Sequence, residues 1–349
     1  MSAPSLNEGP LLPTEPPPEG IRFWFGSWTG RLLVINSIVF VLMSIQSKSL
    51  MMPDTSTLLA VGAKDPVGLA QGQIWRLFTP IFIHIGLLHF AVNSYTLYII
   101  GWQIERILGP WWFLVLYIVS GVCGNVTSAL FSVNLSAGAS GALFGLLGVG
   151  FCLESVIGRR IEAVTGIRPR NRAYAMTVLI NLGIGFMVPF IDNSAHLGGL
   201  MAGLVSTYAM LNIRPNSLQS PRPVLGKLML GGLILFIGIG GWLGSSPQFV
   251  LKRLKHEVSK VERNEERLFY LSQAIEIDPN DAELRFERAR ILLLFGEGKY
   301  GIFDLRRIVS DPEMKLKIQD LVRELNQKGR VTEAWQVQML LEHGAPEEL

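Results

Sequence analysis

A serine flanked by small residues, in Gly138-Ala139-Ser140-Gly141, lies in a long stretch of the chain that carries no formal charge. This stretch runs from Ile107 to Leu153, more than twice the roughly 20 residues that cross a bilayer, so we expect it to hold two membrane-spanning helices. A serine hydroxyl can act as a nucleophile if a base lies beside it. By itself the motif is weak evidence, because small residues in membrane helices usually form packing surfaces.

Three further polar residues fall in apolar segments of the chain. His89 and Asn93 are four positions apart, so on a helix they share one face, and His196 begins another apolar segment. Polar side chains at membrane depth are costly and need a reason. Each of them, taken alone, is most simply a structural hydrogen-bonding group between helices. Four such groups at matching depth, Ser140 included, favour a reactive site.

Glycines mark the surfaces on which two of these segments are expected to meet. Small residues spaced four apart let another helix approach closely. Contact between the two surfaces would bring Ser140 and His196 within hydrogen-bonding distance, as a nucleophile and its base require. The glycines are Gly141, Gly145 and Gly148 after the serine, and Gly199 and Gly203 after the histidine.

The composition identifies an integral membrane protein and excludes several other classes. Hydrophobic residues make up 49% of the 349 residues and charged residues 17%, and the net charge of +3 is too small to indicate nucleic-acid binding. Cys123 and Cys152 lie in apolar runs, which is more typical of small core residues than of a disulfide. His256-Glu257 begins a zinc-protease pattern, but Lys260 occupies the second histidine position, so we expect no metal site and no cofactor.

The chain divides by composition into four parts. Residues 1–30 are proline-rich and are expected to be a disordered tail, residues 31–213 hold six apolar segments, and residues 214–250 hold a linker and a seventh apolar run. Residues 251–349 have mixed charge and helical periodicity, typical of a small soluble helical domain. The fold class is therefore all-α. The expected spans are about 32–47, 88–104, 111–131, 140–157, 173–190 and 195–213, with a seventh at 228–243.

A cluster of arginines predicts the orientation in the membrane. Positively charged loops favour the cytoplasmic side, so the loop from Arg159 to Arg172 is expected there. Alternation then puts the N-terminus in the cytoplasm and the loops near Val133 and Asp192 on the outer face, in the cell membrane or inner membrane if the source is bacterial. If the seventh run crosses, the C-terminal tail lies outside; if it does not cross, the tail is cytoplasmic.

The C-terminal tail carries a loose internal repeat. The segment from Ala274 to Asp281 recurs from Ile308 to Pro312, close to the spacing of about 34 residues of tetratricopeptide helix pairs. One interpretation is a degenerate tetratricopeptide scaffold that binds a protein partner. A small helical bundle without a ligand accounts for the pattern equally well.

Several motifs together resemble the rhomboid family of intramembrane serine proteases. They are Trp75-Arg76, His84, His89-x-x-x-Asn93, Gly138-Ala139-Ser140-Gly141 and Ala195-His196-Leu197-Gly198-Gly199. Their order fits the six-helix core of that family over about residues 31–213, in a polytopic membrane helix bundle. The seventh apolar run would place the chain among the family's variants with an extra helix, and the helical tail lies outside the resemblance.

The resemblance implies a role for each matching residue. Ser140 would be the nucleophile and His196 the general base, in a dyad without a carboxylate. His89, Asn93 and the backbone N–H of Ser140 would form the oxyanion hole. Phe144 stands where a tyrosine is often found and keeps the aromatic face that packs on the histidine. The supporting residues would be Gly138, Gly141, Phe144, Gly199, Trp75 and Arg76.

The implied activity is cleavage of single-pass membrane proteins near the outer face of the bilayer. A catalytically inactive relative that binds membrane clients is a second possibility, disfavoured because Ser140 and His196 are both present. A transporter should have polar residues along a path across the bilayer, whereas these residues cluster at one depth. An aspartyl intramembrane protease would need two mid-span aspartates, which the sequence lacks.

Overall fold

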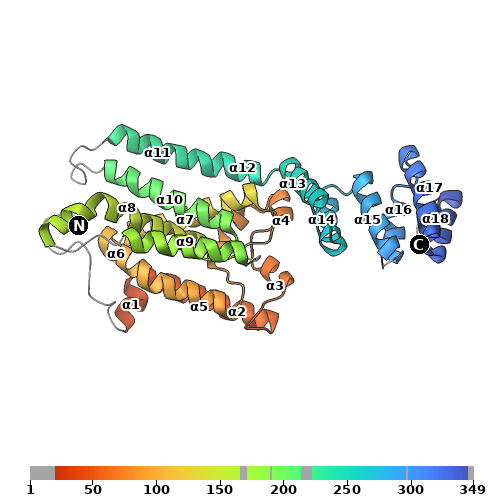
Figure 1. The fold of residues 1–349 in the computed structure, drawn as a ribbon. Coiled ribbons are helices and arrows are strands. Elements are labelled where there is room, and N and C mark those ends of the chain that lie inside the picture. The colour runs from red at the N-terminus through yellow and green to blue at the C-terminus, as the bar shows by residue number, and fades with distance from the viewer. Residues whose placement is uncertain (1–19, 166–170, 189–190, 214–221, 296–297, 345–349) are drawn as a thin grey trace. The chain divides into compact units, whose positions relative to one another are not determined.

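The computed structural model describes residues 20–165, 171–188, 191–213, 222–295 and 298–344 (Figure 1). Most of the expected N-terminal tail, and Arg168 and Arg170 of the basic loop, lie outside these residues. The fold is all-α, as expected, and within the described ranges the one β-bridge joins Lys64 to Ser136. The chain forms two compact units that divide between Ser245 and Ser246.

The first unit is a helical bundle with a folded loop after its first long helix (Figure 1). Helices α11 and α12 and the turn between them form one continuous helix over Pro223–Gly244. The elements are α1 (Ile21–Gly26), α2 (Trp28–Ser47), α3 (Thr55–Ala60), α4 (Pro66–Ala70), the 3₁₀ turns η1 (Ile74–Leu77) and η2 (Thr79–Phe82), α5 (Leu87–Thr96), the π-helical turn η3 (Leu97–Gly101), α6 (Trp102–Leu108), α7 (Pro110–Phe131), α8 (Ser140–Thr165), α9 (Asn171–Met187), α10 (Asn193–Ile213), α11 (Pro223–Leu235), the π-helical turn η4 (Phe236–Gly240) and α12 (Gly241–Gly244).

Among the described residues, three helices are both long enough and apolar enough to cross a bilayer. They are Trp28–Ser47, Pro110–Phe131 and Pro223–Gly244, and shorter apolar helices run over Ser140–Val156 and Arg172–Met187. The three helices contain the expected spans at 32–47, 111–131 and 228–243. The third is the least buried of them, with 17% of its apolar window covered by the rest of the protein.

Helix α1 corrects one expected boundary. The composition predicts a disordered tail over residues 1–30, whereas Ile21–Gly26 form a helix whose Phe23 is 2% exposed. The Phe23 ring packs edge-on against Tyr98 and Trp102, with ring centroids 5.4 and 5.8 Å away. This aromatic contact orders the chain ahead of α2, and Ser27 between the two helices accepts a hydrogen bond from the Gly30 N–H as the N-cap of α2.

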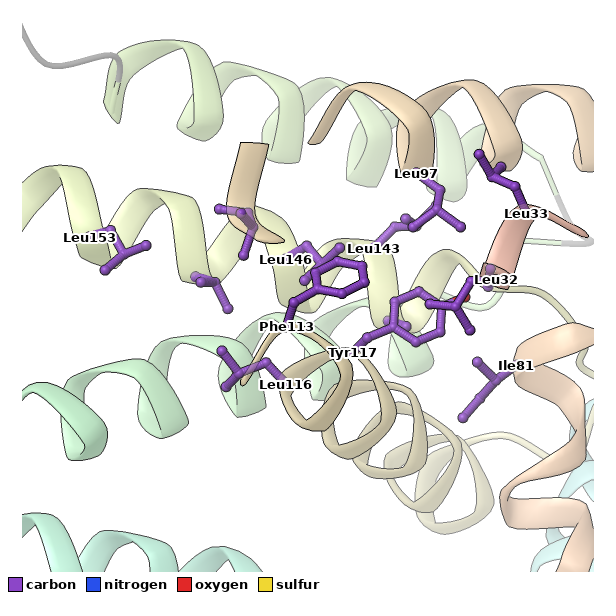
Figure 2. Packing of buried hydrophobic residues seen from close by; sticks show 14 of the residues in the cluster. Leu32, Leu33, Ile81, Leu97, Phe113, Leu116, Tyr117, Leu143, Leu146 and Leu153 are labelled. Carbon is purple, nitrogen blue, oxygen red and sulfur yellow. The ribbon is translucent and has the colours of Figure 1, made fainter. Parts of the chain in front are cut away.

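Helix α8 is the centre of the first unit. Every residue from Gly141 to Gly150 is buried, so this helix is surrounded by protein on all sides. In Figure 2, Phe113 and Tyr117 of α7 point toward Leu143 and Leu146 of α8 within one apolar cluster. Helices α7, α9 and α10 all contact α8. Ser140, at the N-terminus of α8, is therefore attached to the most buried helix of the unit.

The expected contact between two glycine surfaces is confirmed. A methyl group added at Gly199 would collide with the carbonyl oxygen of Gly141, and one added at Gly203 with that of Gly145. At Gly148 an added methyl would lie 2.6 Å from the carbonyl oxygen of Leu200. Helices α8 and α10 thus touch backbone to backbone along more than one turn, which only residues without a side chain allow.

The long loop after α2 folds into short helices instead of running free. Asp54 and Asp65 are the N-caps of α3 and α4, where their carboxylates accept hydrogen bonds from the N–H groups of Thr57 and Gly68. The side chain of Asn125 in α7 donates a hydrogen bond to the carbonyl of Leu77, at a distance of 3.0 Å. The loop is therefore anchored to the bundle close to the candidate site.

The second unit is wholly helical in its described residues. Its helices pack mainly on their neighbours in sequence around a buried apolar cluster. Between α15 and α16, the buried Asp304 accepts hydrogen bonds from Arg285 and Arg288 at 2.7–2.8 Å. The helices are α13 (Pro247–Lys260), α14 (Asn264–Ile277), α15 (Ala282–Phe295), α16 (Gly298–Arg306), α17 (Pro312–Gln327) and α18 (Val331–His343).

The glycine contact gives a first testable prediction. Gly203→Ala should destabilise the protein by about 1–3 kcal/mol, because the new methyl overlaps backbone that cannot rotate away. Thermal unfolding of the purified protein in detergent measures the effect. Gly232→Ala is the matched control, since an added methyl there meets no atom within 4 Å. Equal unfolding temperatures for the two variants would contradict the close contact.

A second prediction concerns the buried carboxylate of the C-terminal unit. Asp304→Ala should lower the stability of α15 and α16 by about 3–5 kcal/mol, because two arginines lose the charge that compensates them. Hydrogen–deuterium exchange of those helices in the full-length protein measures the loss as a lower free energy of opening. Asp320→Ala removes an exposed ion pair with Arg323 and should change that free energy by less than about 1 kcal/mol. Similar exchange in both variants would refute the prediction.

Candidate active site

The structure brings Ser140 and His196 into direct contact, although they are far apart in sequence. The Oγ atom of Ser140 lies 2.9 Å from Nε2 of His196. Ser140 is the first residue of α8, and His196 lies in the first turn of α10. The glycine contact between these helices sets the distance between the two side chains, and the pair has the geometry of a nucleophile and its base.

The ring of Phe144 holds the imidazole of His196 from one face. The two rings are stacked, with centroids 4.1 Å apart and planes within 10° of parallel. Among the described residues, Nδ1 of His196 has no hydrogen-bonding partner. For Nε2 to accept a proton from Ser140, the neutral ring must carry its hydrogen on Nδ1. Stacking on Phe144 orients this imidazole, and no carboxylate in the described part of the chain accepts a hydrogen bond from it.

His89 lies beside the serine loop, the segment that leads through Gly138 to Ser140, and its Nε2 atom faces that loop. The backbone N–H of Ile85 donates a hydrogen bond to Nδ1 of His89 at 3.2 Å, so the neutral ring carries its hydrogen on Nε2. A methyl group added at Gly138 would lie 2.9 Å from this Nε2 and 3.5 Å from the Ser140 Oγ. The Nε2–H of His89 is therefore a donor close to the nucleophile.

Asn93 follows one helical turn after His89, and its side chain is buried. Its side-chain nitrogen donates a hydrogen bond to the carbonyl oxygen of His89, 2.8 Å away. The amide has two hydrogens, so this bond fixes the rotamer and leaves the second hydrogen for another acceptor. The two residues share one face of α5, as their spacing predicts.

Gly138 shapes the backbone that enters the serine helix. Its φ angle is +142°, a conformation that residues with side chains rarely adopt, and its N–H donates to the carbonyl of Pro80 at 2.9 Å. An added methyl would lie 2.7 Å from Cε1 of His89. Both the conformation and the contact with the histidine ring require glycine here.

The other predicted residues lie around the pair or apart from it. Gly141 faces the carbonyl of Ala195 across the helix contact, and Gly199 lies against Gly141. Arg76 is buried and donates hydrogen bonds to the carbonyl of Ala63 and to Gln73, both at 2.7 Å. Trp75 is 54% exposed and does not join the site.

Three residues beside the site were not among the candidates from sequence. Lys64 and Ser128, which are buried, and Asp192, which is half-buried, form a hydrogen-bonded chain that ends four residues before His196. The one sequence signal was the position of Asp192 directly before an apolar segment, where an aspartate can cap a helix. Nothing in the sequence links Lys64 to it, because a lysine in a loop is normally exposed.

The comparisons with known proteins agree with these motifs. The Rhomboid domain model matches residues 71–213. Rhomboid protease GluP of Bacillus subtilis is 38% identical over 184 residues, which are 53% of this chain and 35% of that protein. RHOMBOID-like protein 5 of Arabidopsis thaliana is 36% identical over 177 residues, which are 49% of this chain and 55% of that protein.

The matched region extends over most of one relative. Rhomboid-like protease 1 of Toxoplasma gondii is 30% identical over 214 residues, covering 57% of this chain and 70% of that protein. In several other relatives, the chain spans only about a third to a half of their length. Because the similarity to the Toxoplasma protein covers far more than the motifs of the site, this chain belongs to the rhomboid family of multi-pass membrane proteins.

Proposed function

We propose that this protein is an intramembrane serine endopeptidase, with Ser140 as nucleophile and His196 as general base. The observation that carries the proposal is the 2.9 Å contact between Ser140 Oγ and His196 Nε2 at the N-terminal ends of two tightly packed helices. The names of two relatives, Rhomboid protease GluP and Rhomboid-like protease 1, support the same activity.

In the proposed reaction, Nε2 of His196 takes the hydroxyl proton while Ser140 Oγ attacks a peptide carbonyl carbon. The carbonyl oxygen becomes negatively charged in the tetrahedral intermediate. Collapse of this intermediate breaks the C–N bond, and His196 gives its proton to the leaving amine. A water molecule, deprotonated by the same histidine, then hydrolyses the acyl-enzyme and regenerates the serine. Phe144 keeps the imidazole in one plane through these transfers.

We propose His89, Asn93 and the backbone N–H of Ser140 as the oxyanion donors. Three observations support this assignment: the Nε2–H of His89 faces the serine loop, Asn93 has a second amide hydrogen, and Ser140 begins a helix. The first N–H groups of a helix have no partner within it and carry partial positive charge, which favours an anion there.

The substrates we propose are single-pass membrane proteins cut near the outer face of the bilayer. A peptide bond within a helix has its carbonyl hydrogen-bonded and shielded, so the substrate must unwind at the cleavage site. Segments with small or helix-weakening residues meet that need. The orientation follows from the arginine loop, with the N-terminus in the cytoplasm and the site opening outward.

The proposed membrane core comprises six spans within residues 31–213, followed by a seventh crossing helix over Pro223–Gly244. The length and apolar surface of that last helix support its crossing. For the C-terminal unit we propose a tetratricopeptide-like scaffold that binds a protein partner. Asp278-Pro279 precedes α15 and Asp311-Pro312 begins α17, at the spacing such a repeat needs.

The central prediction is that both members of the dyad are essential. Ser140→Ala and His196→Ala should each reduce cleavage of a reporter with one transmembrane segment to background, in purified protein reconstituted into liposomes. Ser37→Ala on α2, whose hydroxyl donates to the carbonyl of Leu33, and His343→Ala in the C-terminal unit are matched controls that should keep full activity. Cleavage that survives Ser140→Ala in folded protein would disprove the proposed mechanism.

The oxyanion donors give a separate prediction. His89→Ala and Asn93→Ala should each lower kcat by about 10²–10³-fold with little change in KM, because their hydrogen bonds strengthen only when the oxyanion forms. Asn181→Ala is the control, because its amide donates to the carbonyl of Thr177 in the geometry that Asn93 uses toward His89. If Asn93→Ala behaves like Asn181→Ala, Asn93 is not an oxyanion donor.

A further inference from the structure

Lys64, in the loop after α2, is fully buried beside the candidate site. Its ammonium donates hydrogen bonds to Ser128 Oγ at 2.8 Å and to the carbonyl of Ser132 at 3.1 Å. Both acceptors belong to the C-terminal end of α7. A buried ammonium is costly unless it is paired with negative charge, so a buried lysine requires an anionic partner nearby.

Asp192 supplies that negative charge from the start of α10. Its Oδ2 accepts a hydrogen bond from Ser128 Oγ, the same hydroxyl that Lys64 contacts. Its Oδ1 accepts from the N–H of Ala195 at 3.0 Å, and its carbonyl accepts from the N–H of His196 at 3.1 Å. Asp192 is thus the N-cap of the helix whose first turn carries the proposed general base.

The charges of this pair act on one another. Burial by itself would raise the pKa of Asp192, but the positive charge of Lys64 and hydrogen bonds from Ser128, Ala195 and Ser136 bring it below the usual range. The pair thus consists of the fully buried ammonium of Lys64 and the half-buried carboxylate of Asp192, joined through the Ser128 hydroxyl.

The backbone of Lys64 connects the same pair to the serine. Lys64 and Ser136 exchange two backbone hydrogen bonds, of 2.8 and 3.0 Å, in an isolated antiparallel bridge. Ser136 stands four residues before Ser140. One residue of the first loop is thus tied both to the segment that leads to the nucleophile and to the cap of the helix that carries the base.

We propose that Lys64 and Asp192 are positioning residues that set the distance between Ser140 and His196 in the proposed proteolytic reaction. They do not touch the reacting atoms. The ammonium attracts the carboxylate at the start of α10, and the backbone bridge keeps the serine loop at the same depth. A buried ion pair is weak evidence of stability, because desolvation offsets its attraction, so its main effect here is geometric. The inference rests on the proposed function, which defines the reaction being positioned.

The test uses three variants of the full-length protein in liposomes. Lys64→Met removes the ammonium and leaves Asp192 unpaired, Asp192→Asn keeps a capping side chain without the charge, and the double variant removes both charges. Each single variant should lower kcat by about 10- to 100-fold with KM changed by less than about twofold, as expected for a small displacement of reacting groups. The double variant should lose less than the product of the single losses, because the two residues act on one another.

Glu105→Gln is the matched control for loss of a buried charge. Glu105 accepts hydrogen bonds from the backbone N–H of Trp28 and from Thr29, at 2.7–2.8 Å. It lies sixteen residues after His89 in the helical stretch formed by α5, η3 and α6, about 24 Å away along that stretch. This variant should lower the unfolding temperature while kcat stays unchanged. The rate at which a fluorophosphonate labels Ser140 gives a second readout, and it should fall for the Lys64 and Asp192 variants but not for Glu105→Gln.

The outcomes separate this inference from the proposed function. If the wild type cleaves but Lys64→Met leaves kcat and the labelling rate unchanged, the positioning role is wrong and the proposed function stands. The same conclusion follows if the losses of the two single variants simply multiply in the double variant. Wild-type protein that neither cleaves nor reacts with the probe overturns the proposed function and the positioning role with it. A double-variant cycle of unfolding temperatures then still decides whether Lys64 and Asp192 interact.

Discussion

The contact between the backbones of α8 and α10 is the constraint on which the rest of the structure depends. Gly199 and Gly203 lie against the carbonyl oxygens of Gly141 and Gly145, where a single added methyl group has no space. Two helices that touch in this way cannot slide or rotate without a collision. The contact therefore fixes the distance between the N-terminal ends of the two helices, which carry Ser140 and His196.

The polar groups of the site are arranged by local contacts within that frame. Phe144 stacks on His196, the N–H of Ile85 fixes the hydrogen of His89 on Nε2, and Gly138 adopts a backbone conformation open to few other residues. Each contact uses a neighbour in the apolar interior instead of a charged partner. This suits a site at membrane depth, where an uncompensated charge is expensive.

The loop after α2 connects α7 to the segment that precedes Ser140. Capping aspartates fold it into short helices, Asn125 fastens it to α7, and Arg76 binds its backbone from inside. A segment that the sequence composition indicates only as a long connection is thus an ordered part of the bundle that packs beside the serine loop. Within this segment, Lys64 contacts α7 and the serine loop and lies close to the start of α10.

The sequence by itself determined the helical class, the membrane core, the shared face of His89 and Asn93, and the two glycine surfaces that bring Ser140 to His196. These follow from spacing along one helix and from the cost of polar groups in lipid, both of which a linear sequence encodes. Only the tertiary structure decided that α1 is ordered against Tyr98 and Trp102, and that the buried Lys64 is linked through Ser128 to Asp192. Those features depend on contacts between residues far apart in the chain, and a charged residue in a loop carries no local sign of what will cover it.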